Sequence, residues 1–137
     1  MYRRLVMPVD LGHVERLPKA LQVAADLAKH YGATVIFVSV TAEVPTPIAH
    51  NPAEFSQKLE AFGRAQAEKH GITAETRAYA SHDPTIDTDK TLLKAINELE
   101  ADLVVMASHV PGVTDYIWAG HGATISAHSD ASVFLVR

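Results

Sequence analysis

The sequence contains no cysteine, and this absence removes several kinds of chemistry at once. Disulfide bonds, thiolate zinc sites and a cysteine nucleophile are all excluded. Long apolar runs are also missing, since the longest cover only a few residues and a membrane-spanning helix needs about 20. The opening Met-Tyr-Arg-Arg leads into an apolar stretch that is too short for a secretion signal. We therefore expect a cytoplasmic protein with no membrane partner.

Positive charge is scarce as well, because 12 lysines and arginines stand against 16 aspartates and glutamates. A nucleic-acid partner would require a basic face to neutralise its phosphates, and the net charge of −4 argues against one. What the sequence does have is an ordinary apolar fraction of 47% over 137 residues. We therefore expect residues 1–137 to form a single domain with its own core.

The familiar catalytic motifs are absent too. The sequence holds no nucleophile elbow, no Walker lysine after a glycine loop and no His-Glu helix pair. Three aspartates, Asp83, Asp87 and Asp89, lie close together but lack the spacing of a calcium loop. They are more typical of a solvated loop and a helix cap. The sequence therefore does not indicate an enzyme.

Several short runs of Val, Ile and Leu predict β-strands. Continuous apolar character, rather than strict alternation, is expected of parallel strands that helices cover on both faces. A fifth run, at residues 74–80, alternates more and is predicted to lie nearer an edge. The four stronger strands are expected at residues 5–9, 34–40, 103–107 and 132–136.

Apolar residues at helical spacing fill the gaps between these strands. The first such stripe stops before Gly32, which is well placed to end a helix, and the second stops near Gly71. Polar residues 81–89 predict a loop before the third helix, and a last short helix is expected at residues 124–128. The alternation of strands and helices predicts an α/β fold with an open, doubly wound parallel sheet.

In such a sheet, ligands bind outside the carboxyl ends of the strands, where the strand order reverses. Asp10 directly follows the first strand, so its carboxylate could accept hydrogen bonds from ribose hydroxyls or hold a magnesium ion. It could equally cap the first helix or close a turn. Later in the chain, Gly120-His121-Gly122-Ala123 opens the last helix, where small residues let backbone N–H groups approach a phosphate.

Two histidines near these segments have no obvious role. His109 or His121 could donate a hydrogen bond to a phosphate, or both could bind a metal with Asp10 or Asp115. They could also be loop histidines that bond to backbone or water. The metal site is the weaker alternative, because the spacing matches no known ligand motif.

Three blocks of sequence resemble the universal stress protein family. They are the opening YRRLVMPVD, the run EADLVVMASH at residues 100–109, which family members carry as a GADLIVMGS-like run, and the closing SAHSDASVFLVR. The resemblance implies an adenine nucleotide alpha hydrolase-like sheet with strand order 3-2-1-4-5, and a homodimer paired through residues 132–137. It also implies a regulatory protein of the stress response, with an unknown protein partner, that binds ATP or a related adenine nucleotide, either alone or with Mg²⁺. The alternative is a dimeric interaction module whose pocket is occluded.

The resemblance also implies which residues contact the nucleotide. Family members that bind nucleotides carry a Gly-x2-Gly-x9-Gly-[Ser/Thr] motif, and its first two glycines are replaced here by Ala107 and Val110. The last glycine of the motif matches Gly120, which places His121 at the Ser/Thr position. Alternatively it matches Ala119, which places Gly120 at that position. Val110 resists positive φ, so the loop must run differently there. The residues expected at the nucleotide are Pro8, Val9, Asp10, Val40, Met106, Ala107, Ser108, His109, Gly120, His121, Gly122 and Ala123.

Overall fold

The protein is an α/β domain built on one parallel sheet. The structure, a computed structural model, describes residues 1–107 and 121–137, without the side chains of Thr85 and Ile86. The sheet has five strands in the order β3-β2-β1-β4-β5, so the predicted topology is confirmed. The strands are β1 (Arg4–Pro8), β2 (Thr34–Ala42), β3 (Ala74–Ser81), β4 (Leu103–Ala107) and β5 (Ser132–Val136).

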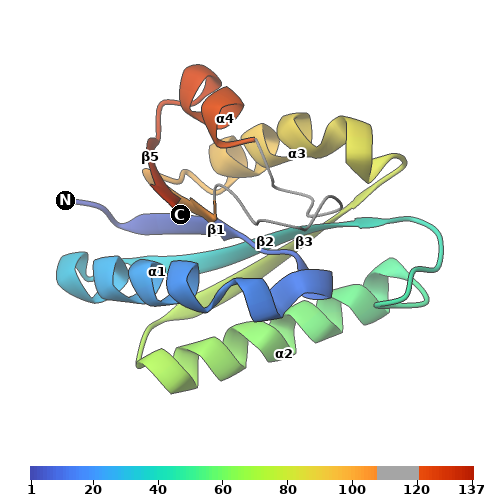
Figure 1. The fold of residues 1–137 in the computed structure, drawn as a ribbon, viewed down its shortest axis with the longest axis horizontal. Coiled ribbons are helices and arrows are strands. Elements are labelled where there is room, and N and C mark those ends of the chain that lie inside the picture. Colours follow the sequence, from blue (N-terminus) through green and yellow to red (C-terminus); the bar gives the residue numbers. More distant parts are fainter. Residues whose placement is uncertain (108–120) are drawn as a thin grey trace.

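Helices cover both faces of this sheet (Figure 1). One face carries α1 (Pro18–Tyr31) and α2 (Pro52–His70), and the other carries α3 (Pro84–Glu98) and α4 (Gly122–His128). A short 3-10 helix, η1 (Leu11–Arg16), joins β1 to α1. As expected, α1 and α2 end at Gly32 and Gly71, whose φ angles of 66° and 65° are left-handed and suit glycine.

Two elements differ from the sequence expectation. The loop predicted at residues 81–89 is wrong, because α3 already begins at Pro84. Proline suits the first helical position, and the Asp87 N–H donates to the carbonyl of Asp83 at 3.0 Å. The polar residues of this segment thus form the first turn of a helix. The 3-10 helix η1 was not predicted, because its few residues carry no helical stripe.

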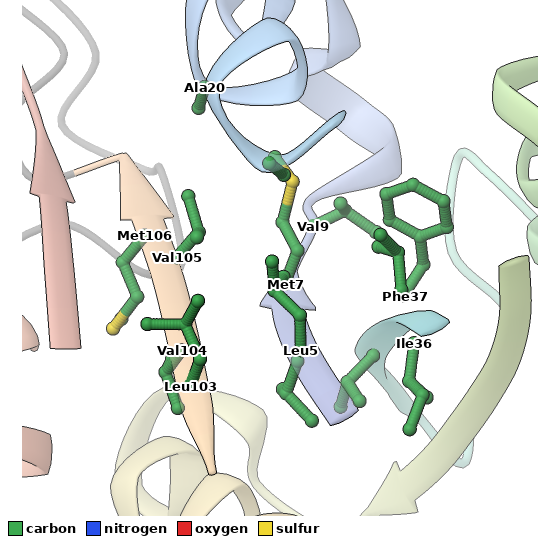
Figure 2. Close-up of a cluster of buried hydrophobic side chains, with 14 of the residues drawn as sticks. Leu5, Met7, Val9, Ala20, Ile36, Phe37, Leu103, Val104, Val105 and Met106 are labelled. Atoms are coloured by element: carbon green, nitrogen blue, oxygen red, sulfur yellow. The ribbon is translucent and has the colours of Figure 1, made fainter. Parts of the chain in front are cut away.

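The core lies along the central strands. Figure 2 shows side chains of β1, β2 and β4 gathered together, with Ala20 of α1 beside them. Leu5, Met7 and Phe37 are at most 1% exposed, and all five residues of β4 are buried. Burial on both faces explains why these strands read as continuous apolar runs. In contrast, β3 is mostly half-buried or exposed, as expected of an edge strand.

Candidate functional site

Pairing between β1 and β4 stops before the carboxyl ends of these two strands. The ladder between β1 and β4 covers only Leu5 with Leu103 and Val6 with Val104. The ladder between β1 and β2 continues to Pro8 and Val38. Since the strand order reverses between β1 and β4, this is the edge where an open α/β sheet offers room to a ligand.

A hollow of about 200 Å³ lies at this edge, beside the ends of β1 and β2. Its lining combines apolar side chains with a few polar groups, as is typical of small-molecule sites. The segment that follows β1, the end of β2 and the loop after β2 supply most of it. The lining residues are Asp10, Leu11, Gly12, Ser39, Val40, Thr41, Ala42, Thr46, Ile48, Phe55 and Pro84.

Hydrogen bonds fix the segment that carries the first of these residues. The N–H of Val9 donates to the carbonyl of Val38 at 2.8 Å, which extends the β1–β2 pairing by one residue. The hydroxyl of Ser39, which is 2% exposed, donates to the carbonyl of Val9 at 2.7 Å. Ser39 therefore holds the chain where it leaves the sheet and presents Asp10. The side chain of Val9 itself is fully buried.

Asp10 is the N-cap of η1, which is the capping role that the sequence left open. Its Oδ1 accepts a hydrogen bond from the N–H of Gly12 at 2.9 Å, and its Oδ2 lies 2.9 Å from Nδ1 of His13. A Cβ at residue 12 would lie 3.3 Å from Oδ1 of Asp10, so glycine allows this close approach. A carboxylate has about four acceptor sites, so capping and ligand binding are compatible.

Val40 shares the hollow with Asp10, and its backbone faces the space beyond the end of β1. Along β2, the N–H of Thr34 and the carbonyl of Val38 bond toward β1, whereas the N–H of Val35 bonds toward β3. Because strand residues alternate in direction, both backbone groups of Val40 point to the β1 side, past the last pair of that ladder. The site thus presents an adjacent hydrogen-bond donor and acceptor.

The other predicted residues lie elsewhere along the same edge. Met106 and Ala107 are 1% and 8% exposed and end β4, which is the neighbour of β1 on the side away from β2. They do not line the hollow. Pro8, the last residue of β1, is buried and does not line it either. The predicted residues Ser108, His109 and Gly120 lie outside the described residues, as do Val110, Asp115 and Ala119.

His121 has a partner that the sequence did not reveal. Its Nδ1 is hydrogen-bonded to Oδ1 of Asp89, which lies on α3, and its carbonyl accepts a bond from the N–H of Ile125 at 3.1 Å. A carboxylate at Nδ1 favours the tautomer with the proton on that nitrogen, which leaves Nε2 to meet other groups. Asp89 and His121 are distant in the sequence, so no local pattern could have paired them.

Gly122 and Ala123 begin α4, a helix of seven residues. Gly122 is buried, and a Cβ there would overlap the end of the Leu135 side chain on β5. This glycine therefore lets α4 approach the edge strand, a packing role that sequence reasoning did not consider. Ala123 is exposed.

The described part of the chain holds neither a cluster of metal-ligating side chains nor a membrane-spanning helix. Across residues 1–107 and 121–137, no three histidine or carboxylate side chains gather closely enough to hold a metal ion. The alternative set of Asp10, His109 and His121 depends on a residue outside these ranges. No helix in the same ranges has the length and apolar character to cross a membrane.

Comparison with known proteins gives consistent matches. Universal stress protein G from Salmonella typhimurium is 24% identical over 142 residues, and the match covers all of both chains. The structure of UspA from Lactobacillus plantarum is similar with a TM-score of 0.70 at 15% identity, covering 99% of this chain and 98% of that one. A universal stress protein from Archaeoglobus fulgidus in complex with dAMP has a TM-score of 0.68 at 15% identity, covering 99% and 98%.

The two solved structures show that the fold is shared. The sequence match extends further, because a model of the universal stress protein family matches residues 1–137. That range includes all three blocks on which the sequence resemblance rests. The chain therefore belongs to the universal stress protein family.

Proposed function

We propose that this protein binds ATP or a related adenine nucleotide at the carboxyl edge of its sheet and acts as a regulator in the stress response. One observation carries the proposal: Asp10 and Val40 line the same hollow, beside the point where the strand order reverses. The dAMP complex of the Archaeoglobus fulgidus relative supports the choice of ligand class.

Each of the two residues has a defined task in this proposal. The N–H and carbonyl of Val40 meet the edge of the adenine ring, which offers an acceptor nitrogen next to an amino group. The carboxylate of Asp10 accepts hydrogen bonds from the ribose hydroxyls, as acidic residues do in other α/β nucleotide sites. Its bonds to Gly12 and His13 keep it oriented before the ligand arrives. Such preorganisation lowers the entropic cost of binding.

The phosphates extend from the hollow toward the start of α4. His121 presents Nε2 there, and in its imidazolium form the ring would donate from Nε2 to a phosphate oxygen while Asp89 holds Nδ1. Asp10 is the only carboxylate among the described residues that line the hollow. Mg²⁺ would therefore arrive with the phosphates, since one carboxylate is too little for a site made by the protein alone. Hydrolysis is expected to be slow, because residues 1–107 and 121–137 show no general base or arginine finger at the hollow.

Calorimetric titration with ATP, ADP, AMP and cyclic AMP tests the proposal. The variant Asp10→Asn keeps an oxygen for the Gly12 N–H but loses the charge, so the Kd should rise roughly tenfold for the best nucleotide. Asp130→Asn makes the same change at an exposed position and should leave the Kd unaltered. Absence of binding heat with all four nucleotides would contradict the proposal.

A second function, that of a dimeric interaction module, is favoured by the surface of β5. This edge strand exposes Phe134 and Leu135 by 44% and 42%, and an unpaired apolar edge invites association. We propose a homodimer through residues 132–137, in which the two edge strands meet about a twofold axis.

Light scattering at micromolar concentration should give twice the mass of 14.8 kDa for the wild-type chain. Phe134→Glu places a charge in the proposed interface and should give the monomer mass. Val44→Glu, at a position 65% exposed in the loop after β2, serves as the control and should stay dimeric. A monomer mass for the wild type would reject the dimer and leave nucleotide binding untouched.

A further inference from the structure

A second hollow, of about 400 Å³, lies between the η1–α1 segment and α2. Both helices pack on the sheet, and a groove lies between them. From α1, the lining includes Leu21 and Gln22, and from α2 it includes Phe62, Gln66 and Lys69. The three α2 residues follow one another at intervals of three or four, so they form one stripe along the helix.

The floor of this groove is apolar and held in place. Leu21 is 7% exposed, and the ring of Phe62 packs edge-to-face on Phe37 with the centroids 5.3 Å apart. This contact fixes the orientation of the Phe62 ring. An apolar ligand body lying on these two side chains would gain hydrophobic contact without having to order them first.

One end of the groove is cationic. Lys69 and His70 lie there, and in residues 1–107 and 121–137 no carboxylate lies within ion-pair distance of the Lys69 ammonium group. Burial, followed by the nearby charges of Lys69 and Lys29, lowers the pKa of His70 below its usual 6.5, although Asp26 acts in the opposite direction. The lysines supply the positive charge at this end, and an anionic group would complement it. Glu15 of η1 also lines the groove, but its side chain is mostly exposed and its Oε1 lies 4.0 Å from Nε of Arg16, which offsets its charge.

Gln66 lies between the apolar floor and the cationic end. Its Oε1 is buried and, among the described residues, is the only buried side-chain nitrogen or oxygen atom without a hydrogen-bond partner. Buried acceptors without partners are rare and call for an explanation. The last torsion of a glutamine side chain is soft, so a modest rotation would turn this oxygen toward a donor in the groove.

We propose that the groove binds a small amphipathic 2-hydroxy carboxylate. Its apolar body lies on Leu21 and Phe62, its carboxylate pairs with Lys69, and its hydroxyl donates to Oε1 of Gln66. Phe62 and Lys69 are seven residues apart, so the stripe spans about 10 Å along the helix axis. That length suits an aromatic ring joined to a carboxylate by two carbons. The site is separate from the nucleotide hollow and does not depend on nucleotide binding.

The test is an NMR titration of the full ¹⁵N-labelled chain with 3-phenyllactate, in which the chemical shifts of the backbone amides are monitored. Saturable shifts should gather at Leu21, Gln22, Gln66 and Lys69. A Kd on the order of 1 mM is expected for a ligand of about 12 non-hydrogen atoms. Absence of saturable shifts, or shifts centred on Asp10 and Val40, would overturn the proposal.

Matched ligands and variants assign the contacts. Loss of the hydroxyl in 3-phenylpropionate should weaken binding roughly fivefold, and Gln66→Met should abolish this difference between the two acids. Lys69→Gln should weaken the binding of 3-phenyllactate roughly threefold, as expected for the loss of an exposed charge pair. Lys90→Gln makes the same charge change on α3, across the sheet, and should have no effect. An equal loss of affinity for 3-phenyllactate in both lysine variants would show that only the net charge of the protein matters, and it would reject the site.

Discussion

Glu100 has a backbone conformation that most residues avoid. Its φ angle is 53°, just after the end of α3, and family members carry glycine at the start of this block. Two residues on, Asp102 accepts hydrogen bonds from the N–H groups of Arg3 and Arg4 at 2.9 and 3.1 Å. Asp102 thereby ties the start of β1 to β4. Asp102 thus gives this part of the sequence block a structural role that is independent of any ligand.

The left-handed conformation at residue 100 leads to a prediction about stability. Glu100→Gly should stabilise the protein by about 0.5–1 kcal/mol, because the relief of strain exceeds the added entropy of the unfolded chain. The melting temperature should rise by about 2–4 °C. Glu100→Ala removes the same carboxylate but keeps a Cβ, so it should bring no such gain. Equal melting temperatures for the two variants would reject strain as the cause.

At the level of single residues, the sequence predicted some features and missed others. The sequence indicated Asp10 as a candidate because it follows a buried strand, and it located Gly32 as a helix end because that residue follows a helical stripe. Ser39 and Asp89 were not found as supports of the site, since their partners Val9 and His121 are 30 and 32 residues away in the chain. Hydrogen bonds over such separations leave no local pattern in the sequence.

The packing of α2 against β3 depends on a glycine in the middle of the helix. A Cβ at Gly63 would lie 2.5 Å from Cγ2 of Thr76 and 3.7 Å from Cδ2 of Phe37. Helix propensity alone disfavours glycine by about 1 kcal/mol relative to alanine. Its presence here is explained by the close approach of helix and sheet.

Gly63→Ala should therefore destabilise the protein by about 1–3 kcal/mol in chemical denaturation, despite the better helix propensity of alanine. Thr76→Ser removes the methyl group in question. In the double variant Gly63→Ala/Thr76→Ser, most of the loss should be recovered, which gives a favourable coupling energy between the two sites. If Gly63→Ala alone stabilised the protein, the close approach would be refuted.

At the same scale, local signals located the helices and strands but were less reliable for their ends. The start of α3 was misread because proline and acidic residues are common both in loops and in first helical turns. The strands β2 and β3 run on to Ala42 and Ser81, slightly beyond the apolar runs that predicted them. Pairing between the two strands explains the extension, since Ala42 and Ser81 lie opposite each other in the ladder.

For the whole molecule, the strand order was accessible from the sequence. Alternating strands and helices require parallel pairing, and the family resemblance then selects the order 3-2-1-4-5 that the sheet has. The proposed nucleotide site was less accessible from the sequence. Its base and ribose side can be assembled from Asp10 and Val40, whereas much of its predicted phosphate side belongs to residues 108–120, outside the described ranges.

The central claim is that an adenine nucleotide occupies the hollow between Asp10 and Val40, and its most direct test is an NMR titration of the ¹⁵N-labelled chain with ATP. Saturable shifts are expected at the backbone amides of Gly12 and Val40, because the first bonds to the carboxylate proposed to bind the ribose and the second is proposed to meet the base. Asp10→Asn should reduce both shifts at equal ATP. Amides of Gly12 and Val40 that stay unchanged at millimolar ATP would contradict the claim.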